Sequence, residues 1–435
     1  MHFVTDTLKT VGLPLFSESK RQYEALSSRT PTQADIEHFL DRYQYICVQP
    51  TPFCNLDCSY CYLGDRSISS SAMRQRTAGR IGEIALEAGG ITCCIWHGGE
   101  PLSAGTGHLV QLIDSVNRTA PLLSHVVYSN GTLISQEWVS YAKRADIHHC
   151  ISLDGPGSLA DLRRYRSGAE SSERAENGVR LLVEAGLSVD SHCVVRRQHL
   201  GHELELMSYF SNLGIQQVAF NFEESDGVNH ATNPIQFSEA HQFWMNVASL
   251  ALDRGDLPQV RELNTWATGT LGSIDRKNHP LTILSDGQII FASPELGQYG
   301  NQFSSFRSGN ILEQSLKVCA SKWMSSNQFH DFQSGDSRCL EECQYASTCD
   351  QRFGANKLSE NGTTNSTATV ACTQQVMALD AAMQSIARAR ATFDGAQSLT
   401  EIAKAILKRS EQNERQTISF GSGGGPPKQS TATVN

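Results

Sequence analysis

Short apolar runs alternate with longer amphipathic stretches from about residue 44 of this 435-residue chain. The short runs are typical of buried strands, whereas the longer stretches repeat apolar residues at spacings of three and four and predict helices. Glycine follows several of these helices, as it commonly does where a helix ends. The six predicted strands cover residues 44–48, 91–96, 124–129, 148–153, 189–195 and 217–222.

Strands that alternate with helices predict an α/β fold with a parallel sheet and right-handed crossovers, either open or curled into a full or partial barrel. In both forms, functional groups gather just beyond the carboxyl ends of the strands. Distinctive residues follow the first four predicted strands, namely CNLDCSYC (54–61), HGGEP (97–101), NGT (130–132) and DGP (154–156). The pattern therefore predicts one functional site at this edge of the sheet.

A second region follows a predicted helix at 238–255. It opens with LTILSDGQIIFASPE (281–295), which predicts a hairpin around Asp286-Gly287. Residues 376–411 predict helix, and the tail from about Glu414 is too poor in apolar residues to pack. The predicted division is a helical extension (1–43), a barrel (44–255), a second cysteine-bearing domain (256–380), a C-terminal helix (381–412) and a disordered tail (413–435).

Composition argues against several classes of function. A formal net charge of −9, without a basic stripe, gives no general attraction to nucleic acid, which is therefore not expected as a partner. There is no run of about 18 apolar residues, so no membrane segment is expected. The first residues lack the basic start and apolar stretch of a signal peptide, which predicts a cytoplasmic protein.

Thirteen cysteines in a reducing compartment point to metal binding or redox chemistry rather than to disulfides. Cys54, Cys58 and Cys61 lie close enough in sequence for one tight loop to bring their sulfurs together, and sulfur ligands suit zinc or iron–sulfur clusters. A structural zinc site needs four ligands, so zinc would require a remote His as the fourth. Packing of the three thiols without any metal is another alternative. An iron–sulfur cube held by three cysteines leaves one iron open to a substrate or cofactor.

This CxxxCxxC motif, with the aromatic Tyr60 before its last cysteine, resembles the signature of the radical S-adenosylmethionine (SAM) enzymes. The resemblance implies a partial (β/α)6 barrel. It also implies a [4Fe–4S] cluster on the three cysteines, whose open iron is bound by the amino and carboxylate groups of SAM. Electron transfer then splits SAM to give a 5′-deoxyadenosyl radical.

Other motifs match this family. Gly98, Gly99 and Glu100 resemble its GGEP element, whose backbone approaches the SAM amino group, and glycine permits close approach because it has no Cβ. Arg164 matches an arginine that pairs with the SAM carboxylate, with Arg163 and Arg166 as weaker alternatives; an arginine can make a forked pair with a carboxylate. The family positions near the SAM ribose imply contacts from Asn130, Ser152 and Asp154.

A second cysteine group contains Cys339, Cys343, Cys349 and Cys372. Four thiols suit a closed site, which by itself holds either zinc or an iron–sulfur cluster. Downstream of a radical SAM core, the arrangement resembles the SPASM extension, which implies an auxiliary [4Fe–4S] cluster. Since the predicted hairpin carries no cysteine, one auxiliary cluster is expected.

Four stretches resemble the cyclophane-forming radical SAM/SPASM peptide maturases, including the glycine-rich-repeat type. This resemblance implies that a ribosomal precursor peptide and an electron donor such as flavodoxin or ferredoxin are partners, and that an aromatic ring becomes joined to a side-chain carbon. The alternatives are another radical modification, such as formylglycine formation by sulfatase-maturing relatives, and a non-catalytic peptide scaffold with zinc. The stretches are QPTPFCNLDCSYCYL (49–63), FNFEESDGVN (220–229), IIFASPELGQYG (289–300) and NKLSENGT (356–363).

Proton acceptors are less well marked by the sequence. Asp350, next to Cys349, is a candidate base. Glu223, Glu224 and Glu295 are candidate peptide contacts or proton acceptors at the barrel mouth, and solvated carboxylates are the alternative.

Overall fold

A computed structural model of the chain describes residues 30–64, 66–67, 72–229, 233–272, 279–297, 301–349, 354–394 and 398–421. The candidate base Asp350, most of the predicted extension and the end of the predicted tail lie outside these ranges. No helix among the described residues is both long enough and apolar enough to cross a membrane.

One sheet of ten strands organises the described chain, in the order β10-β9-β8-β1-β2-β3-β4-β5-β6-β7. Strands β1 to β6 are parallel, each paired with the next. All six overlap the predicted apolar runs, which confirms the predicted α/β fold with a parallel sheet. These strands are β1 (Tyr43–Val48), β2 (Cys93–Trp96), β3 (Ser124–Ser129), β4 (His148–Ser152), β5 (Val189–Val195) and β6 (Gln217–Phe222).

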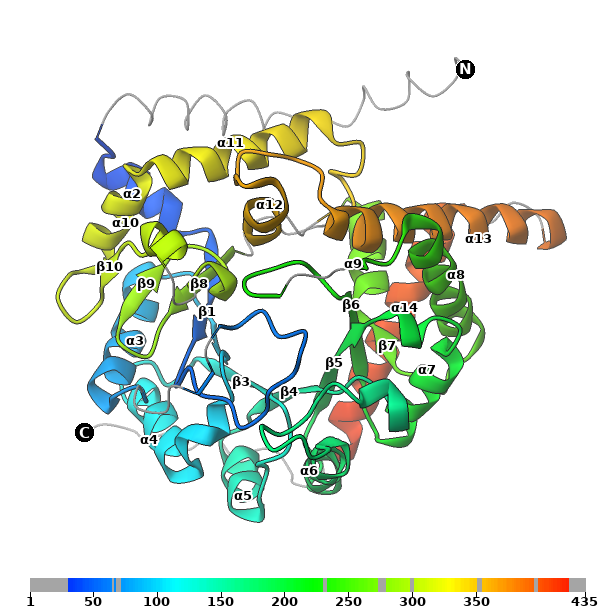
Figure 1. The fold of residues 1–435 in the computed structure, drawn as a ribbon, viewed down its shortest axis with the longest axis horizontal. Coiled ribbons are helices and arrows are strands. Elements are labelled where there is room, and N and C mark those ends of the chain that lie inside the picture. The colour runs from blue at the N-terminus through cyan, green and yellow to red at the C-terminus, as the bar shows by residue number, and fades with distance from the viewer. Residues whose placement is uncertain are drawn as a thin grey trace, which may run out of the picture.

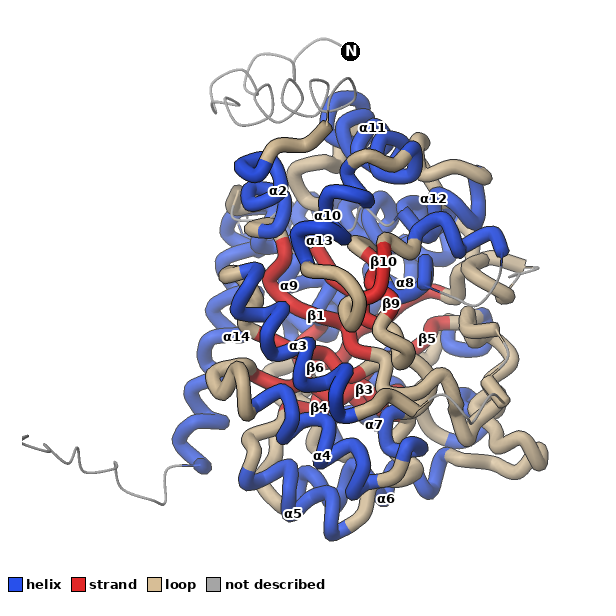
Figure 2. Tube along the Cα trace, turned by 90° about the vertical axis from the view of Figure 1, so that its left-hand side faces the viewer, coloured by secondary structure: helices blue, strands red, loops and turns tan. Residues whose placement is uncertain are grey.

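Helices cover the outside of this sheet. Figure 1 shows α3 to α8 following one another around an arc of strands, and Figure 2 shows the strands enclosed by helices. The arc is a partial barrel, because its end strands, β7 (Gln259–Val260) and β10 (Gly309–Asn310), do not pair with each other. The surrounding helices are α3 (Gln75–Ala88), α4 (Thr106–Asn117), α5 (Gln136–Arg144), α6 (Ser172–Glu184), α7 (Glu203–Asn212) and α8 (Phe237–Asp253).

Helix α5 illustrates how local sequence positions these helices. The Ser135 hydroxyl accepts a hydrogen bond from the Trp138 backbone N–H at 3.3 Å and caps the first turn. Lys143 and Arg144 in the last turn complement the helix dipole. The Trp138 ring is fully buried and donates its indole N–H to His149 on β4 at 2.9 Å, so the apolar face of α5 is fixed against the sheet.

The second region extends the same sheet. Strand β8 (His279–Ile283) lies parallel to β1, with Leu281 opposite Ile46. Strand β9 (Gln288–Ile290) returns antiparallel to β8, forming the hairpin expected around Asp286-Gly287. Because β8 satisfies the backbone groups that β1 would otherwise expose at an edge, the predicted boundary at residue 256 does not separate two sheets.

The C-terminal helices pack against the barrel. One helix was expected over 381–412; the described residues of this range form parts of two, of which the first ends at Asp394 and the second runs from Leu399 to Gly421, past the point where the tail was expected to begin. The buried Trp244 and Trp266 rings bond to Gln374 and Asp380, which fixes this region against the barrel. The remaining helices are α2 (Gln33–Leu40), α9 (Arg261–Thr270), α10 (Leu316–Met324), α11 (Asn327–Glu342), α12 (Gly354–Asn361), α13 (Ala378–Asp394) and α14 (Leu399–Gly421).

Candidate functional site

A cavity of about 470 Å³ lies at the carboxyl ends of the parallel strands. It is the site at which the sequence predicted a concentration of functional groups. Of the residues predicted to bind the first cluster or SAM, Asp154 and Arg164 do not line it. Those of this set that do are Cys54, Cys58, Tyr60, Cys61, Gly98, Gly99, Glu100, Asn130 and Ser152.

The loop that carries the first cysteines is held by backbone contacts. The Cys61 N–H donates to the Cys58 carbonyl at 3.2 Å, which closes a tight turn between two of the three thiols. Leu56 forms an isolated bridge with Tyr165, and the Asp57 N–H donates to the Arg164 carbonyl at 2.8 Å. The loop is therefore pinned to the segment that follows β4.

The three thiols suit an iron–sulfur cluster by their chemistry and their shared location. Burial, together with the neighbouring Glu100 carboxylate and the Cys58 and Cys61 sulfurs, raises the pKa of Cys54 to about 12. Binding of a cluster would displace these protons, because thiolates are the ligands. The described residues contain no preformed group of three His, Cys, Asp or Glu side chains for a single metal ion. A cluster places its cysteines on different irons and does not require that convergence.

The GGEP element packs directly on the segment before Cys54. Gly99 has φ of 63°, and a Cβ on it would lie 2.4 Å from the Phe53 carbonyl oxygen and 2.5 Å from that of Thr51. The Glu100 N–H donates to the same Phe53 oxygen at 2.8 Å. Only glycine permits this approach, so the motif holds the cysteine loop against the end of β2.

Glu100 joins the ends of β2 and β3. Its buried carboxylate accepts hydrogen bonds from the Ser129 hydroxyl at 2.9 Å and from the Asn130 N–H at 2.7 Å. Asn130 in turn donates to the Asn55 side chain at 2.9 Å and lies 3.8 Å from the Cys54 sulfur. Glu100 and Asn130, both expected near SAM, thus also fix the position of the cysteine loop.

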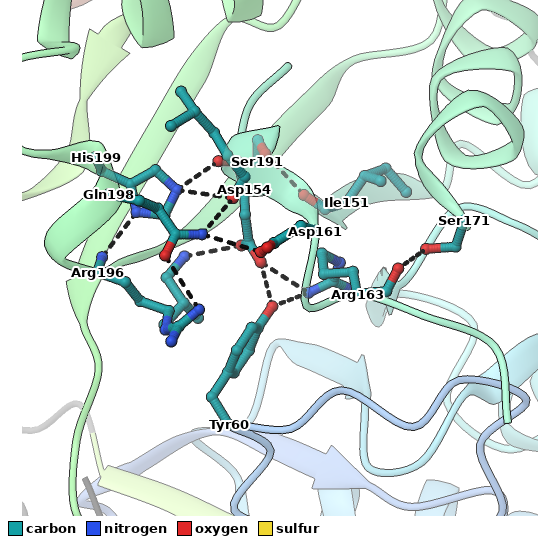
Figure 3. A network of polar contacts seen from close by, with 12 residues as sticks. Tyr60, Ile151, Asp154, Asp161, Arg163, Ser171, Ser191, Arg196, Gln198 and His199 are labelled. Atoms are coloured by element: carbon teal, nitrogen blue, oxygen red, sulfur yellow. Dashed lines mark hydrogen bonds and ion pairs between the residues drawn. The ribbon is translucent and has the colours of Figure 1, made fainter. Parts of the chain in front are cut away.

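Tyr60 anchors the same loop to β4 and β5 through a buried polar network (Figure 3). Its hydroxyl donates to the Asp154 carboxylate and accepts a hydrogen bond from Arg163 at 2.7 Å. The other Asp154 oxygen accepts the Val194 N–H at 3.0 Å. Asp154 was expected near the ribose, but it lies behind Tyr60, where its role is to hold that side chain.

The arginine expected at the SAM carboxylate is not placed for that contact. Arg164 does not line the cavity; its guanidinium bonds to the Gly168 carbonyl at 3.1 Å and lies 3.6 Å from Glu170. The buried Arg163 lines the cavity instead. Arg164 pairs with Glu170 in a short antiparallel bridge, and neighbouring side chains in extended backbone point to opposite sides. Arg166 contacts the Cys54 carbonyl at 3.3 Å.

Besides Glu100, four carboxylates line the cavity together with the cysteines: Glu223, Glu224, Asp226 and Glu295. Burial, and after it the nearby Asp226 charge, raises the pKa of Glu295 to about 7. Burial likewise raises the pKa of Glu224 to about 7, against a hydrogen bond from Asn356 that lowers it. Glu223 instead pairs with Arg196 at 2.9 Å. Asp226 was not predicted as a site residue, although it lies in the stretch 220–229 that also contains Glu223 and Glu224.

The second cysteine group lies on the helices beyond the barrel. Cys339 is in the last turn of α11, Cys343 follows that helix, and Cys372 begins the π-helical turn Cys372–Met377. Burial raises the pKa of Cys339, the nearby Lys357 opposes that rise, and the Cys372 sulfur adds to it. Residues distant in the sequence are thus near neighbours here, and a set of four thiols, with Cys349, suits a closed iron–sulfur site.

Comparisons with known proteins agree with this geometry. Residues 48–209 match the model of the Radical SAM superfamily. An uncharacterized protein of Synechocystis sp. is 29% identical over 350 residues, covering 75% of this chain and 87% of its own length. A cysteine-type anaerobic sulfatase-maturating enzyme of Clostridium perfringens is 23% identical over 320 residues, covering 67% and 82%.

Solved structures share the fold. The structure of anSMEcpe with bound AdoMet has a TM-score of 0.65 at 17% identity, covering 84% of this chain and 98% of that chain. Streptococcus suis SuiB bound to its precursor peptide SuiA has a TM-score of 0.54 at 15% identity, covering 72% and 70%.

Residues 48–209 therefore form a radical SAM domain, on an α/β fold that the structural neighbours share. The chain is an enzyme related to peptide-modifying maturases.

Proposed function

We propose that this enzyme modifies a ribosomally made precursor peptide and joins an aromatic ring of the peptide to a side-chain carbon, giving a cyclophane. One observation carries the proposal: the thiols of Cys54, Cys58 and Cys61 share a single cavity with a group of carboxylates. A radical source and a proton acceptor are the two functions that such a bond requires. The motifs that resemble cyclophane-forming maturases support the choice of product.

The cavity residues match the groups of SAM. Cys54, Cys58 and Cys61 would hold a [4Fe–4S] cluster, and the backbone at Gly98 and Gly99 would approach the SAM amino group. Arg163 would pair with the SAM carboxylate, because its guanidinium is buried and lines the cavity. When bound, SAM and the clusters supply a hydrogen-abstracting 5′-deoxyadenosyl radical and an acceptor for the electron released as the product forms.

The chain's own residues orient the peptide and take up a proton. Each crosslink removes two hydrogens from the peptide, one from the side-chain carbon and one from the ring. The ring hydrogen leaves as a proton, and a carboxylate with a pKa near the operating pH is suited to accept it. Glu295 and Glu224 have that property, with pKa values raised to about 7 by burial.

The second cysteine group is assigned to one auxiliary [4Fe–4S] cluster. Its four thiols, Cys339, Cys343, Cys349 and Cys372, form a closed set suited to electron transfer rather than to substrate binding. A flavodoxin or ferredoxin is the proposed electron donor.

Formylglycine formation is the second candidate. It is favoured by the Clostridium perfringens sulfatase-maturating relative, of which 82% is covered. Conversion of serine to formylglycine also removes two hydrogens, so for a serine substrate the intact mass does not separate it from a crosslink. Conversion of cysteine exchanges sulfur for oxygen as well, and there the intact mass does separate the two. Fragmentation separates them in either case, because only a crosslink ties an aromatic residue to another residue.

Tandem mass spectrometry tests the proposal. The iron–sulfur-reconstituted protein is incubated anaerobically with SAM, a reductant and a candidate precursor peptide, with Cys58→Ala as the control. We expect loss of two hydrogens per site, with no backbone fragments between an aromatic residue and its partner. An aldehyde in that peptide, or in the Cp18Cys peptide that anSMEcpe binds, would favour formylglycine formation instead.

A further inference from the structure

Helix α12 contacts both the cavity and the second cysteine group. Figure 1 shows α12 between α11 and the barrel. Its Asn356 donates to the Glu224 carboxylate at 2.8 Å, and its Ser359 donates to Asp226 at 2.9 Å. Between them, the Lys357 ammonium lies 3.7 Å from Asp336 and 3.2 Å from the position that a Cβ on Gly335 would take, one turn before Cys339 in α11, so its charge acts on the Cys339 thiol. The helix therefore joins Glu224, one of the proposed proton acceptors, to the proposed redox site.

Lys357 is an unusual residue to find at this position. Only 2% of it is exposed, and burying an ammonium group is unfavourable unless nearby negative charge compensates it. Its distance of 3.7 Å to Asp336 is longer than that of a direct charged hydrogen bond, so this carboxylate alone compensates the cation poorly. Four cysteines on a cluster are thiolates, and they supply the further negative charge that a set of neutral thiols lacks.

We propose that Lys357 is a positioning residue that sets the reduction potential of the auxiliary cluster, by holding a buried positive charge against the Cys339 sulfur. The inference rests on the proposed function in one respect, the assignment of an iron–sulfur cluster to the four cysteines. A positive charge beside a ligand sulfur makes it easier to add an electron to a cluster, and burial strengthens the effect because water screens it less. Lys357 thus raises the potential of the cluster and favours its action as an electron acceptor.

The test isolates the auxiliary cluster. A protein in which Cys54, Cys58 and Cys61 are all replaced by alanine is reconstituted, and the midpoint potential of its remaining cluster is measured by redox titration followed by electron paramagnetic resonance. In this background, Lys357→Met removes the charge while keeping an unbranched side chain. We expect the midpoint to shift to a lower potential, and Lys357→Arg to retain the potential of the parent.

A surface control and a variant of opposite sign sharpen the test. Lys317, on α10, forms an exposed ion pair with Glu37. Lys317→Met makes the same change in net charge and should leave the midpoint unchanged. Asp336→Asn removes a negative charge beside Lys357 and should shift the midpoint upward. If Lys357→Met fails to fold, the upward shift from Asp336→Asn still tests the sign of the effect.

The outcomes separate this inference from the function of the cavity. An unchanged midpoint in Lys357→Met, or an equal shift in Lys317→Met, would overturn the role of Lys357 and leave the auxiliary cluster standing. Absence of any redox-active cluster in the background protein would overturn both the auxiliary cluster and this inference. SAM cleavage by the unmodified protein tests the first cluster independently of all these results.

Discussion

The two cysteine groups are held in different ways. Cys54, Cys58 and Cys61 belong to one loop, and Gly99, Glu100 and Tyr60 attach that loop to the ends of β2 to β5. The second group is assembled from segments far apart in the sequence, as shown by Cys339 at the end of α11 and Cys372 on a π-helical turn. Its geometry depends on how the helices pack.

This difference fits the proposed roles of the two groups. Three thiols beside a cavity leave room for SAM and a peptide, so the loop must hold its position while ligands enter and leave. In the proposed role, the four half-buried thiols of the second group would exchange only electrons, which requires a suitable potential and no open iron. In these roles, the first site must admit SAM and the peptide, whereas the second depends on the charges that surround its cluster.

Removing one cysteine from each group gives the largest expected effects. Cys58→Ala should reduce SAM cleavage to background, because the first cluster loses a ligand. Cys343→Ala should retain SAM cleavage and lose peptide modification. Chromatographic measurement of 5′-deoxyadenosine, with mass spectrometry of the peptide, checks both. If Cys343→Ala also stopped SAM cleavage, the two groups would not be functionally separate.

Each region also contains a glycine that allows close packing. A Cβ at Gly99 would lie 2.4 Å from the Phe53 oxygen, and one at Gly335 in α11 would lie 2.0 Å from the Thr364 oxygen. Alanine at either position should destabilise the protein by about 1–3 kcal/mol, the usual cost of overpacking, as measured by chemical denaturation.

Gly107→Ala is the matched control for these two variants. Gly107 is exposed in α4 with open space around it, so the substitution should not be destabilising. Equal stability losses at Gly99 and Gly107 would mean that the packing of GGEP on the cysteine loop contributes little. In the proposed roles, Gly99→Ala should also impair SAM cleavage, whereas Gly335→Ala should chiefly impair the auxiliary cluster.

Arg163 and Arg164 are neighbours in sequence, but only Arg163 is expected to bind SAM. Arg163→Gln should weaken SAM binding about tenfold or more, the effect of losing one charged hydrogen bond, whereas Arg164→Gln should leave it unchanged. Isothermal titration calorimetry of the reconstituted protein checks both. Because Arg163 also bonds to Tyr60, Arg163→Lys serves as a comparison that keeps the charge. Weaker binding in Arg164→Gln alone would restore the assignment expected from sequence.

A pH profile tests Glu295, a buried carboxylate that lines the cavity, as the proton acceptor. Below a pKa of about 7, the Glu295 carboxyl is protonated and cannot accept the ring proton. The rate of peptide modification should therefore rise severalfold as the pH increases through about 7, while Glu295→Gln should be slower and lack this rise. Single-turnover mass spectrometry measures the rate. An unchanged profile in Glu295→Gln would assign the step to another group, and Glu224→Gln is the next variant to compare.

Features encoded by short segments could be predicted from the sequence. The six parallel strands, the hairpin at Asp286-Gly287 and the grouping of the cysteine loop with GGEP all depend on local periodicity, on turn residues, or on the rule that parallel strands end at one edge. The sequence also places three cysteines within a single loop, so their proximity requires little tertiary information. Their roles as cluster ligands, like those of the second group, remain predictions.

Other features were decided only by tertiary structure, because they depend on contacts between distant segments. The sequence favoured Arg164 over its neighbour Arg163, but the bridge between Arg164 and Glu170 leaves Arg163 as the one that lines the cavity. The pairing of β8 with β1 joins the second region to the barrel sheet, since a parallel edge strand needs a partner that local sequence does not specify. Lys357 resembles any other helical lysine in the sequence. Only the packing of α12 against α11 and the barrel buries its charge beside Cys339 and Asp336.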